Sequence, residues 1–589
     1  MIRLTLPASL LALVTACAPA TEDIAPITPE PTAESAQPTE PATGLVLPLP
    51  SDTIAEIRAD DLRQRIATLS DDAFEGRGPG APVGERTADW IAAEMARVGL
   101  HPAGANGAWF QTVGMVGQTL DENASGLTFS GGASGEDFPM TLREDAVMWT
   151  KKQDRDEASW QDSDLVFVGY GVVAPEYGWD DYDGLDVEGK TVVMLVNDPG
   201  YARQDELFKG NAMTYYGRWT YKFEEAGRQG ATGAIVVHET APASYGWDVV
   251  ANSWSGAQAD LVRSDGGANR TIFESWISEE TARALFAEAG LDFSEMKIRA
   301  KTEGFRSIDM GDLTVSGSFS QSVSTTESRN VVGLLPGQTA PDEYTLFTAH
   351  WDHLGKKSEE RDGEPTQDFY RDHIFNGAVD NATGVAALIE IAEAMAEDEL
   401  DRSALFLAVT LEESGLLGSA FYAENPTVPM NKIVAGLNMD AMLPTGRTRD
   451  MIVVGYGASE LEDLLRDYLE ANDRVIVPDP SPQAGYFYRS DHVSFAKKGV
   501  PMLYADGGTD ARDGGVARGR AVADAYRTQR YHKPMDEYSD DWDLSGIEED
   551  VTALYAVGLK VLQSDEWPTW YSGNEFEAIR KASLAERGS

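Results

Sequence analysis

Strand-forming and helix-forming segments alternate from residue 329 toward the C-terminus, and this alternation constrains the fold more than any other feature. The expected strands lie at 330–335, 344–349, 404–411 and 432–438, and the expected helices at 384–396, 460–470 and 545–562. Such alternation is typical of a mostly parallel sheet covered by helices on both faces. The sequence therefore predicts an α/β fold with a mostly parallel central sheet flanked by helices.

The expected strand at 344–349 is followed by His350 and Asp352. Open α/β sheets bind ligands at the carboxyl ends of their strands. An imidazole with a carboxylate two positions later suits a metal ligand, because the carboxylate can fix the orientation of the ring. By itself this pattern is weak, and a surface cluster at a strand end is the alternative.

More candidate metal ligands follow at later strand and loop ends. They are Asp380, Glu412 or Glu413, Asp440 and His532. With His350 they form a set of five, which suits two metal ions bridged by one carboxylate better than a single open zinc site with three protein ligands. Glu412 and Glu413 are adjacent, so their side chains diverge, and we expect one to bind metal and the other to handle protons.

The middle of the chain has the pattern of a separate α/β module. Strand-forming runs at 164–173, 190–197 and 231–238 surround an expected helix at 218–230, and the module carries no cluster of ligand-type residues. We expect a non-catalytic insertion that serves gating, substrate selection or packing. The expected organisation is a first catalytic segment at 51–138 with helices at 54–69 and 87–98, the insertion at 139–317, a second catalytic segment at 318–570 and a C-terminal tail at 571–589.

The first seventeen residues have the pattern of a bacterial lipoprotein signal peptide. Arg3 precedes a short apolar run at 4–13, and residues 14–17 match a lipobox that ends at Cys17. Cys17 is the only cysteine, so we interpret it as a lipid attachment point. Residues 18–50, rich in Pro, Thr, Ala and Glu, predict a disordered tether. The expected location is the cell envelope, on the periplasmic side or surface of a bacterial membrane; an ordinary cleaved signal peptide is the alternative.

The charge of the chain is strongly negative. It has 48 basic and 97 acidic side chains, a formal net charge of −49. Such a surface repels nucleic acid and anionic lipid headgroups. We therefore expect no nucleic-acid partner and membrane contact through the lipid anchor only.

Five sequence strings together resemble one family. The strings TAHWDHLG, NGAVDNATG, LEESGLLGS, LNMDAM and YHKPMDE are similar to those of the di-zinc exopeptidases of the aminopeptidase-Y and glutamate-carboxypeptidase superfamily. The resemblance runs from about residue 72 to about residue 562, and the middle module resembles the inserted protease-associated domain of that superfamily. It implies the zinc exopeptidase fold.

The resemblance also implies a role for each motif residue. It implies two zinc ions per chain, one held by His350, Asp380 and Asp440, and the other held by Asp380, Glu413 and His532. It implies Glu412 as the general base, Asp352 as support for His350, and Tyr531 as a phenol that stabilises the oxyanion.

One ligand position is ambiguous from spacing alone. His492, in the run Ser490-Asp491-His492, could also complete the second metal site. The family pattern assigns the metal to His532 and leaves Asp491 and His492 near the substrate cleft. We follow that pattern, and we expect His353 to be a supporting or surface residue.

The expected function is zinc-dependent hydrolysis of a peptide bond at a chain end, with peptides as substrates. Aminopeptidase action is the leading hypothesis, and carboxypeptidase or dipeptidase action on the same site is the alternative within the class. A non-catalytic binding protein of the same fold would lack ligands, whereas here every ligand position and the base are filled. Cyclisation of N-terminal glutamine on this scaffold would normally lack the large insertion.

Overall fold

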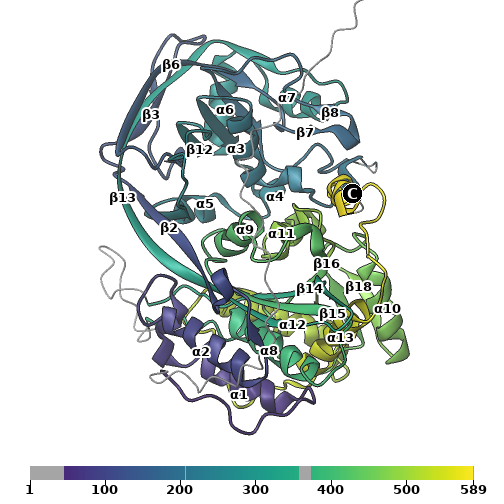
Figure 1. The fold of residues 1–589 in the computed structure, drawn as a ribbon. Coiled ribbons are helices and arrows are strands. Elements are labelled where there is room, and N and C mark those ends of the chain that lie inside the picture. Colours follow the sequence, from purple (N-terminus) through teal and green to yellow (C-terminus); the bar gives the residue numbers. More distant parts are fainter. Residues whose placement is uncertain (1–45, 204, 206, 357–372, 588–589) are drawn as a thin grey trace, which may run out of the picture. The chain divides into compact units, whose positions relative to one another are not determined.

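The computed structural model describes residues 46–203, 205, 207–356 and 373–587, so the expected signal peptide and Cys17 lie outside the described residues. Two sheet regions share one long strand, β13 (Ile308–Leu335), which runs from one region into the other (Figure 1). Within the described residues, no helix is both long enough and apolar enough to cross a membrane.

The first sheet region contains the strands that follow the predicted alternation. Its order is β1-β13-β15-β14-β16-β19-β17-β18. The strands are β1 (His101–Pro102), β14 (Ala340–His350), β15 (Arg402–Val409), β16 (Ile433–Asn438), β17 (Asp450–Val453), β18 (Val475–Pro478) and β19 (Met502–Gly507). Strands β15, β14, β16 and β19 are parallel, and β13 and β17 pair antiparallel to them. The predicted α/β fold with a mostly parallel centre is confirmed.

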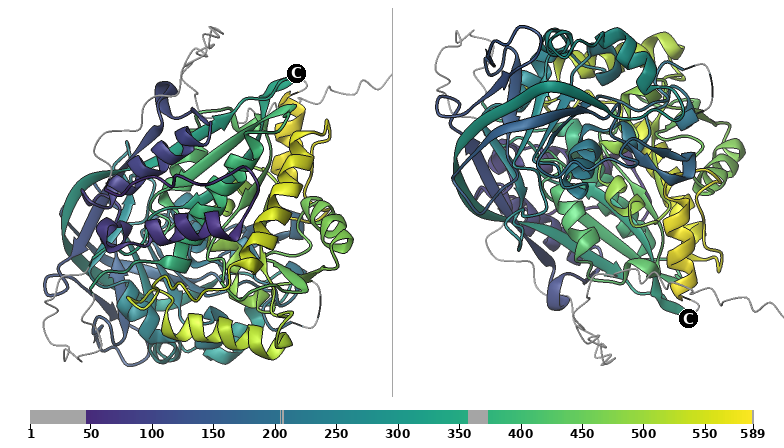
Figure 2. Two further views of the ribbon diagram at one scale, coloured as in Figure 1. Left: turned by 90° about the horizontal axis from the view of Figure 1, so that it is seen from below. Right: turned by 90° about the horizontal axis from the view of Figure 1, so that it is seen from above.

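Alternate residues of the central strand face opposite layers. Phe347 of β14 belongs to the larger apolar core, whereas Leu346 belongs to the core on the other face. Figures 1 and 2 show the helices on both sides of this sheet. One layer contains α1 (Ala59–Leu69), α2 (Glu85–Arg97), α8 (Gly384–Met395), α10 (Leu461–Ala471) and α13 (Ser545–Leu562), and the other contains α9 (Leu417–Glu424) and α11 (His492–Ala496).

The inserted segment has its own sheet and its own apolar core. Its strand order is β5-β12-β10-β9-β6-β13-β3-β4. The strands are β3 (Gly126–Ser130), β4 (Phe138–Pro139), β5 (Ala146–Trp149), β6 (Glu157–Phe167), β9 (Thr191–Leu195), β10 (Gly233–Val237) and β12 (Phe273–Ile277). The helices include α3 (Trp219–Arg228), α6 (Glu279–Glu288) and α7 (Phe293–Ala300).

The insertion starts earlier than the sequence suggested. Strand β3 pairs with β13, and β4 pairs with β3, so both belong to the inserted sheet. Leu127 and Phe129 pack in the core of the insertion. The expected boundary at 139 is therefore wrong: the insertion begins after β2 (Phe110–Leu120). The glycine-rich loop at 131–135 hid this short hairpin, because its strands are only five and two residues long.

The last five residues of the expected tether are packed against the fold. Val46, Leu47 and Leu49 contact the larger core, and the Trp90 indole N–H donates to the carbonyl oxygen of Pro48 at 3.3 Å. The predicted tether at 18–50 is therefore wrong for residues 46–50, because their apolar side chains find a surface that sequence composition does not reveal.

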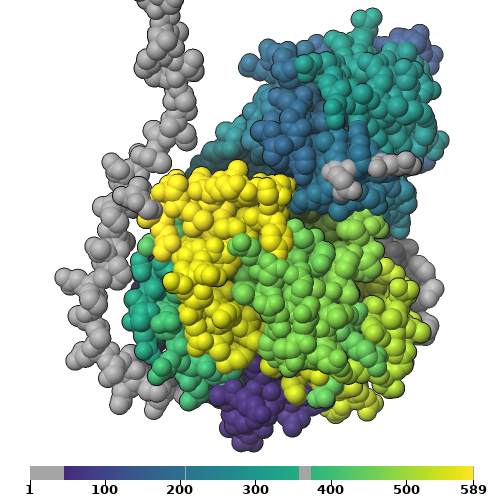
Figure 3. All heavy atoms as spheres, turned by 90° about the vertical axis from the view of Figure 1, so that its right-hand side faces the viewer, coloured from purple at the N-terminus to yellow at the C-terminus, as the bar shows by residue number. Residues whose placement is uncertain are grey.

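The expected C-terminal tail is also packed into the structure. It contains α14 (Glu577–Arg587), and Phe576 is buried in the second core. The segment, yellow in Figure 3, lies beside the inserted segment, since Lys209 donates to Glu575 at 2.7 Å. The sequence missed this role because the one residue that α14 buries is a charged residue, Arg580, and its Ile579 is exposed.

Arg580 is the residue that ties α14 to the sheet. Its buried guanidinium donates to the carbonyl oxygens of Ile433, Val434 and Pro568 at 3.2, 2.6 and 3.0 Å. These carbonyls lose their donor if the side chain is shortened, and an unsatisfied buried polar group costs about 1–3 kcal/mol.

We predict that Arg580→Ala lowers the free energy of unfolding by about 3 kcal/mol. The measurement is the midpoint of thermal or urea unfolding. Lys581→Ala is the matched control, because its side chain on the same helix is 71% exposed and should change stability little. Equal midpoints for Arg580→Ala and the control would contradict this role.

Candidate metal centre and active site

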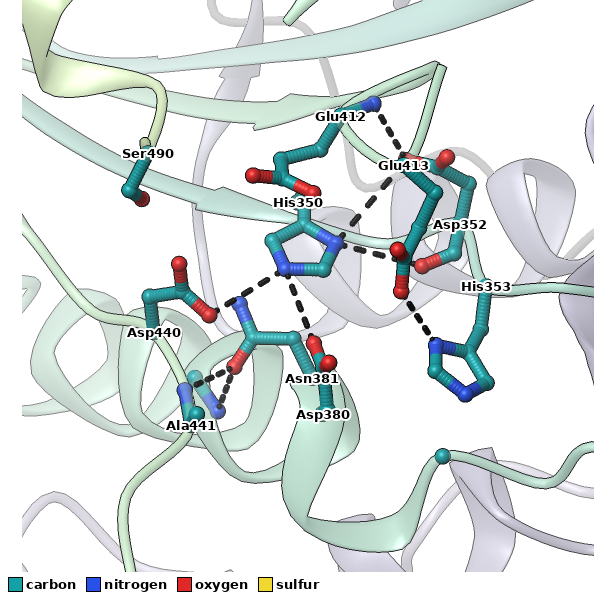
Figure 4. A network of polar contacts seen from close by, with 12 residues as sticks. His350, Asp352, His353, Asp380, Asn381, Glu412, Glu413, Asp440, Ala441 and Ser490 are labelled. Carbon is teal, nitrogen blue, oxygen red and sulfur yellow. Dashed lines mark hydrogen bonds and ion pairs between the residues drawn. The ribbon is translucent and has the colours of Figure 1, made fainter. Parts of the chain in front are cut away.

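Three neighbouring parallel strands bring the candidate residues to one edge of the sheet. Strand β14 lies between β15 and β16, and all three run in the same direction. His350 ends β14, Glu412 and Glu413 follow β15, and Asp440 follows β16. Residues separated by up to ninety positions therefore meet at one edge, as Figure 4 shows.

Asp380 lies between two imidazoles. Its Oδ1 is 3.2 Å from Nε2 of His350, and its Oδ2 is 3.2 Å from Nε2 of His532. Each oxygen of one carboxylate thus faces a different histidine. This is the arrangement expected of a carboxylate that bridges two metal ions.

Each of these imidazoles has a second carboxylate neighbour. Nε2 of His350 is also 3.2 Å from Oδ1 of Asp440, and Nε2 of His532 is 3.0 Å from Oε2 of Glu413. The structure therefore brings together all five predicted ligands in two groups of three that share Asp380.

His353 has a closer contact with this centre than the sequence suggested. Its Nδ1 is 2.5 Å from Oε1 of Glu413, and its ring centroid lies 5.7 Å from that of His532. The side chain is fully buried, and Nε2 has no hydrogen-bond partner among the described residues. His353 is therefore a buried neighbour of the second group and not a surface residue, and its position three residues after His350 was the available signal.

Glu412 lies beside the first group. One of its carboxylate oxygens can approach ligand atoms of His350 and Asp440, since all three atoms lie within 4.8 Å of one another. Burial raises the pKa of Glu412 well above its usual value; His350 opposes this, and the charges of Glu413 and Asp440 add to it. Unlike Glu413, Glu412 has no ion pair with a histidine in the described structure.

Asp352 supports both the first histidine and Glu412. Nδ1 of His350 lies 3.1 Å from the backbone oxygen of Asp352 and 3.9 Å from its carboxylate. The carboxylate accepts a hydrogen bond from the backbone N–H of Glu412 at 3.1 Å. The backbone oxygen of Asp352 is thus the nearer partner of the ring, and the carboxylate orients the start of the Glu412 turn.

His492 lies in an aromatic environment. Its ring centroid is 4.5 Å from that of Phe487 and 5.1 Å from that of Tyr504. Burial lowers the pKa of His492 to about 3, so the ring is neutral. No carboxylate forms an ion pair with His492 among the residues that the structure describes, whereas His532 contacts two.

Asp491 and Tyr531 differ in their exposure to solvent. Asp491 is fully buried, and burial raises the pKa of its carboxyl to about 7. Tyr531 is 44% exposed, and its ring stacks on His532 with a centroid distance of 3.9 Å. The tyrosine therefore covers the second group from the solvent side.

Asp536 is a positioning residue that the sequence did not assign. Its carboxylate accepts hydrogen bonds from the backbone N–H groups of Val379 and Asp380 at 3.1–3.2 Å. It follows His532 by four residues, so one short segment supplies an imidazole and also orients the loop that carries the bridging carboxylate.

Asn381 connects the loop of Asp380 to the loop of Asp440. Its amide nitrogen donates to the carbonyl oxygen of Met439 at 3.0 Å. Its side-chain oxygen accepts from the backbone N–H groups of Gly384 and Ala441 at 2.9 and 3.1 Å. This side chain therefore fixes the distance between two of the predicted ligands (Figure 4).

Arg77, from the N-terminal segment, supports the loops that surround the candidate ligands. Its buried guanidinium donates to the carbonyl oxygens of Trp351 at 2.8 Å and Gly377 at 2.8 Å, and also reaches those of Asn376 and Asp380. Burial lowers the pKa of Arg77 to about 10. The sequence indicated only a glycine-rich turn here.

The donor set fits zinc. The cluster consists of imidazole nitrogens and carboxylate oxygens, which are the ligands that zinc takes together in open catalytic sites. Four carboxylates lie in this largely buried cluster, and a carboxylate removed from water requires a compensating positive charge. Divalent cations supply that charge more fully than the two imidazoles.

A hollow of about 240 Å³ lies elsewhere, where the inserted segment meets the loop after β18. Its lining includes Lys209, Met213, Tyr486 and Phe487. None of the candidate ligands lines this hollow. We therefore do not identify it as the reaction centre.

Comparison with known proteins identifies the class of this segment. Residues 330–556 match the model of a family described as Peptidase family M28. This segment contains every candidate ligand, and its similarity to that family relates it to the zinc exopeptidases. The match does not include the inserted segment, for which the protease-associated domain remains a prediction.

Curated relatives match short stretches of this chain. Aminopeptidase Y of Saccharomyces cerevisiae is 29% identical over 178 residues, which is 28% of this chain and 30% of the relative. The probable leucine aminopeptidase 2 of Aspergillus oryzae is 29% identical over 136 residues, 21% of this chain and 26% of the relative. The match therefore spans less than a third of the length of either relative.

Solved structures that match this chain include the aminopeptidase from Aneurinibacillus sp. strain AM-1. It is 16% identical with a TM-score of 0.46, covering 87% of this chain and 96% of that chain. The zinc aminopeptidase from Bacillus subtilis is 16% identical with a TM-score of 0.39, covering 87% of this chain and 97% of that chain.

We predict that Arg77→Met lowers both the stability of the protein and its metal affinity. The carbonyl oxygens of the two ligand loops lose their shared donor, which should cost at least about 3 kcal/mol of unfolding free energy. Thermal unfolding and metal titration measure the two effects.

Arg86→Met is the matched control, because Arg86 is exposed on α2 and belongs to the same N-terminal segment. Arg77→Lys should lie between wild type and Arg77→Met, since an ammonium cannot span the same carbonyls. Unchanged metal affinity in Arg77→Met would show that the loops keep their positions without it.

Proposed function

We propose that this protein is a di-zinc exopeptidase, most specifically an aminopeptidase that removes N-terminal residues from peptides. The observation that carries the proposal is the position of Asp380, whose two oxygens face two different imidazoles. The match of residues 330–556 to Peptidase family M28 supports peptide hydrolysis. The names of the curated relatives support aminopeptidase over carboxypeptidase or dipeptidase action.

The residues that we propose to hold the metals are those of the two groups. They are His350, Asp380 and Asp440 for one zinc, and Asp380, Glu413 and His532 for the other. When bound, zinc polarises the scissile carbonyl and lowers the pKa of water. His353 is the second candidate imidazole for the group that contains Glu413.

Glu412 is the proposed general base. A carboxylate oxygen of Glu412 takes the proton from the attacking water and delivers it to the leaving amine. Its raised pKa suits the acceptance of that proton, and its lack of a histidine ion pair among the described residues leaves it free to act. Glu413 is engaged by His353 and His532, which makes it the ligand of the adjacent pair.

Asp352 and Tyr531 complete the proposal. The carboxylate of Asp352 holds the backbone N–H of Glu412 and so orients the base. We propose that the phenol of Tyr531, which stacks on His532 at the exposed side, donates to the oxygen on which negative charge develops. A binding protein without activity is disfavoured, since all five ligand positions and the base carry suitable side chains.

We propose that the protein acts in the cell envelope. The support is the lipobox that ends at Cys17 and the Pro-rich segment after it. Peptide substrates and a lipid anchor are the expected partners.

We predict that Glu412→Gln keeps two zinc ions per chain and lowers kcat by roughly 10²–10⁴-fold. The amide keeps the shape of the side chain but cannot accept the proton. Metal analysis and peptide-hydrolysis assays measure the two effects. Glu413→Gln is the comparison, and it should lose zinc. The assignment of the pair is reversed if Glu412→Gln loses a metal and Glu413→Gln does not.

We predict that His532→Ala holds one zinc instead of two, because the second group loses an imidazole that contacts Asp380 and Glu413. His492→Ala is the matched control and should keep both, since its ring contacts aromatic side chains. Metal analysis of both proteins and of His353→Ala is the measurement. Retention of two zinc ions by His532→Ala, with loss in His353→Ala, would assign the site to His353.

A further inference from the structure

Two arginines near the candidate active site lack acidic partners among the described residues. Arg218 immediately precedes α3 of the inserted segment, and Arg489 immediately precedes Ser490. Buried nitrogens of both side chains, Nε of Arg218 and Nε and Nη2 of Arg489, have no hydrogen-bond partner among those residues. Neither arginine forms an ion pair within the same described ranges.

The surroundings of the pair are aromatic instead of acidic. The Arg489 guanidinium lies 5.4 Å from the ring centroid of Tyr486 and 5.9 Å from that of Tyr245. Burial, followed by the like charge of Arg489, lowers the pKa of Arg218 to about 10, and only Tyr245 and Tyr215 act in the opposite direction. Tyr245 is therefore a neighbour that the two arginines share.

The absence of carboxylates beside these two arginines, among the described residues, contrasts with the acidic composition of the chain. The sequence has 97 acidic and 48 basic side chains, so a charged neighbour of an arginine is expected to be acidic about twice as often as basic. Partly buried guanidinium groups without a counter-charge are costly, because desolvation is not compensated. An anionic ligand that binds to the two arginines would supply the missing negative charge and so explain why they have no acidic partner among the described residues.

The position of Arg489 in the chain places its backbone beside the candidate metal centre. The next residue, Ser490, accepts a hydrogen bond from the side chain of Asn438 at 2.8 Å. Asn438 ends β16, two residues before Asp440. Figure 4 shows Ser490 on the side of the cluster where Asp440 and Glu412 lie.

The inserted segment reaches the same region from the other side. Lys497, just after α11, lies with its ammonium 4.6 Å from the ring centroid of Tyr215 and 3.5 Å from a carboxylate oxygen of Glu224 in α3. Contacts of this kind hold the start of α3, and therefore Arg218, against the segment that carries Arg489. The pair thus consists of one arginine from the inserted segment and one from the second catalytic segment.

We propose that Arg218 and Arg489 bind a carboxylate of the substrate close to the scissile bond. The inference rests on the proposed peptidase function and extends it to a substrate class: short peptides with a free α-carboxylate near the cleaved bond, or peptides with an acidic side chain there. Guanidinium groups bind carboxylates through paired, charge-assisted hydrogen bonds, and two of them favour the anion over the neutral amide. This also gives the inserted segment a function in substrate selection.

Matched substrates separate the two sources of the carboxylate. Ala-Ala and Ala-Ala amide differ only in the α-carboxylate, and Ala-Glu amide and Ala-Gln amide differ only in the side chain. We expect wild type to prefer the charged member of one pair by at least about 10-fold in kcat/KM. No preference in either pair would overturn the proposal.

The variants Arg218→Gln and Arg489→Gln test which residues cause the preference. Each should lower kcat/KM for the charged substrate by about 10–100-fold, mainly through KM, and leave the rate on the amide nearly unchanged. Arg306→Gln is the control, because that arginine of the inserted segment is 65% exposed and paired with Asp183. Equal losses on charged and amide substrates would indicate a merely structural role and overturn the proposal.

A binding measurement keeps this inference separate from the proposed function. Calorimetry with zinc-loaded Glu412→Gln protein compares the affinity for each charged peptide with that for its amide. Absence of peptide cleavage by wild type, together with tighter binding of a charged peptide, would reject the peptidase and retain the carboxylate site. Equal affinities within both pairs would reject the site. Arg489→Lys, with an intermediate preference expected, serves if Arg489→Gln does not fold.

Discussion

The buried guanidinium of Arg77 is the interaction on which the geometry of the candidate site depends. It donates to backbone oxygens after β14 and in the loop that carries Asp380, so one side chain fixes two ligand-bearing segments relative to each other. The segment of Arg77 lies more than 250 positions before those loops. A rigid planar donor with five N–H groups suits this task, because it satisfies several converging carbonyls that would otherwise be buried without partners.

The sheet supplies the second constraint. Because β15, β14 and β16 are neighbours and parallel, their carboxyl ends meet, and residues that follow them are close without any special loop. The result is a concentration of buried carboxylates around two imidazoles. Asp536 and Asn381 then hold the bridging loop at fixed distances from its neighbours. Such a cluster is stable with divalent cations, and the same cations make peptide hydrolysis feasible.

The sequence predicted the central strands and helices well, because buried parallel strands are continuous apolar runs and helices have a distinct period. It was less informative where a segment depends on distant partners. The 28-residue strand β13 was visible only at its last six residues, since residues 308–320 pair with the inserted segment and the following residues pair with β2. The hairpin of β3 and β4, the packed residues 46–50 and helix α14 were missed for the same reason.

The sequence by itself determined which chemical groups follow each strand, and hence His350, Asp380, the pair Glu412–Glu413 and Asp440 as candidates. Only the tertiary structure decided which imidazoles approach them. His532 contacts Asp380 and Glu413, His353 contacts Glu413, and His492 lies among aromatic rings. The physical reason is that strand order sets which chain ends meet, whereas the approach of a side chain from a distant loop depends on packing. The juxtaposition of Arg218 and Arg489 arises in the same way.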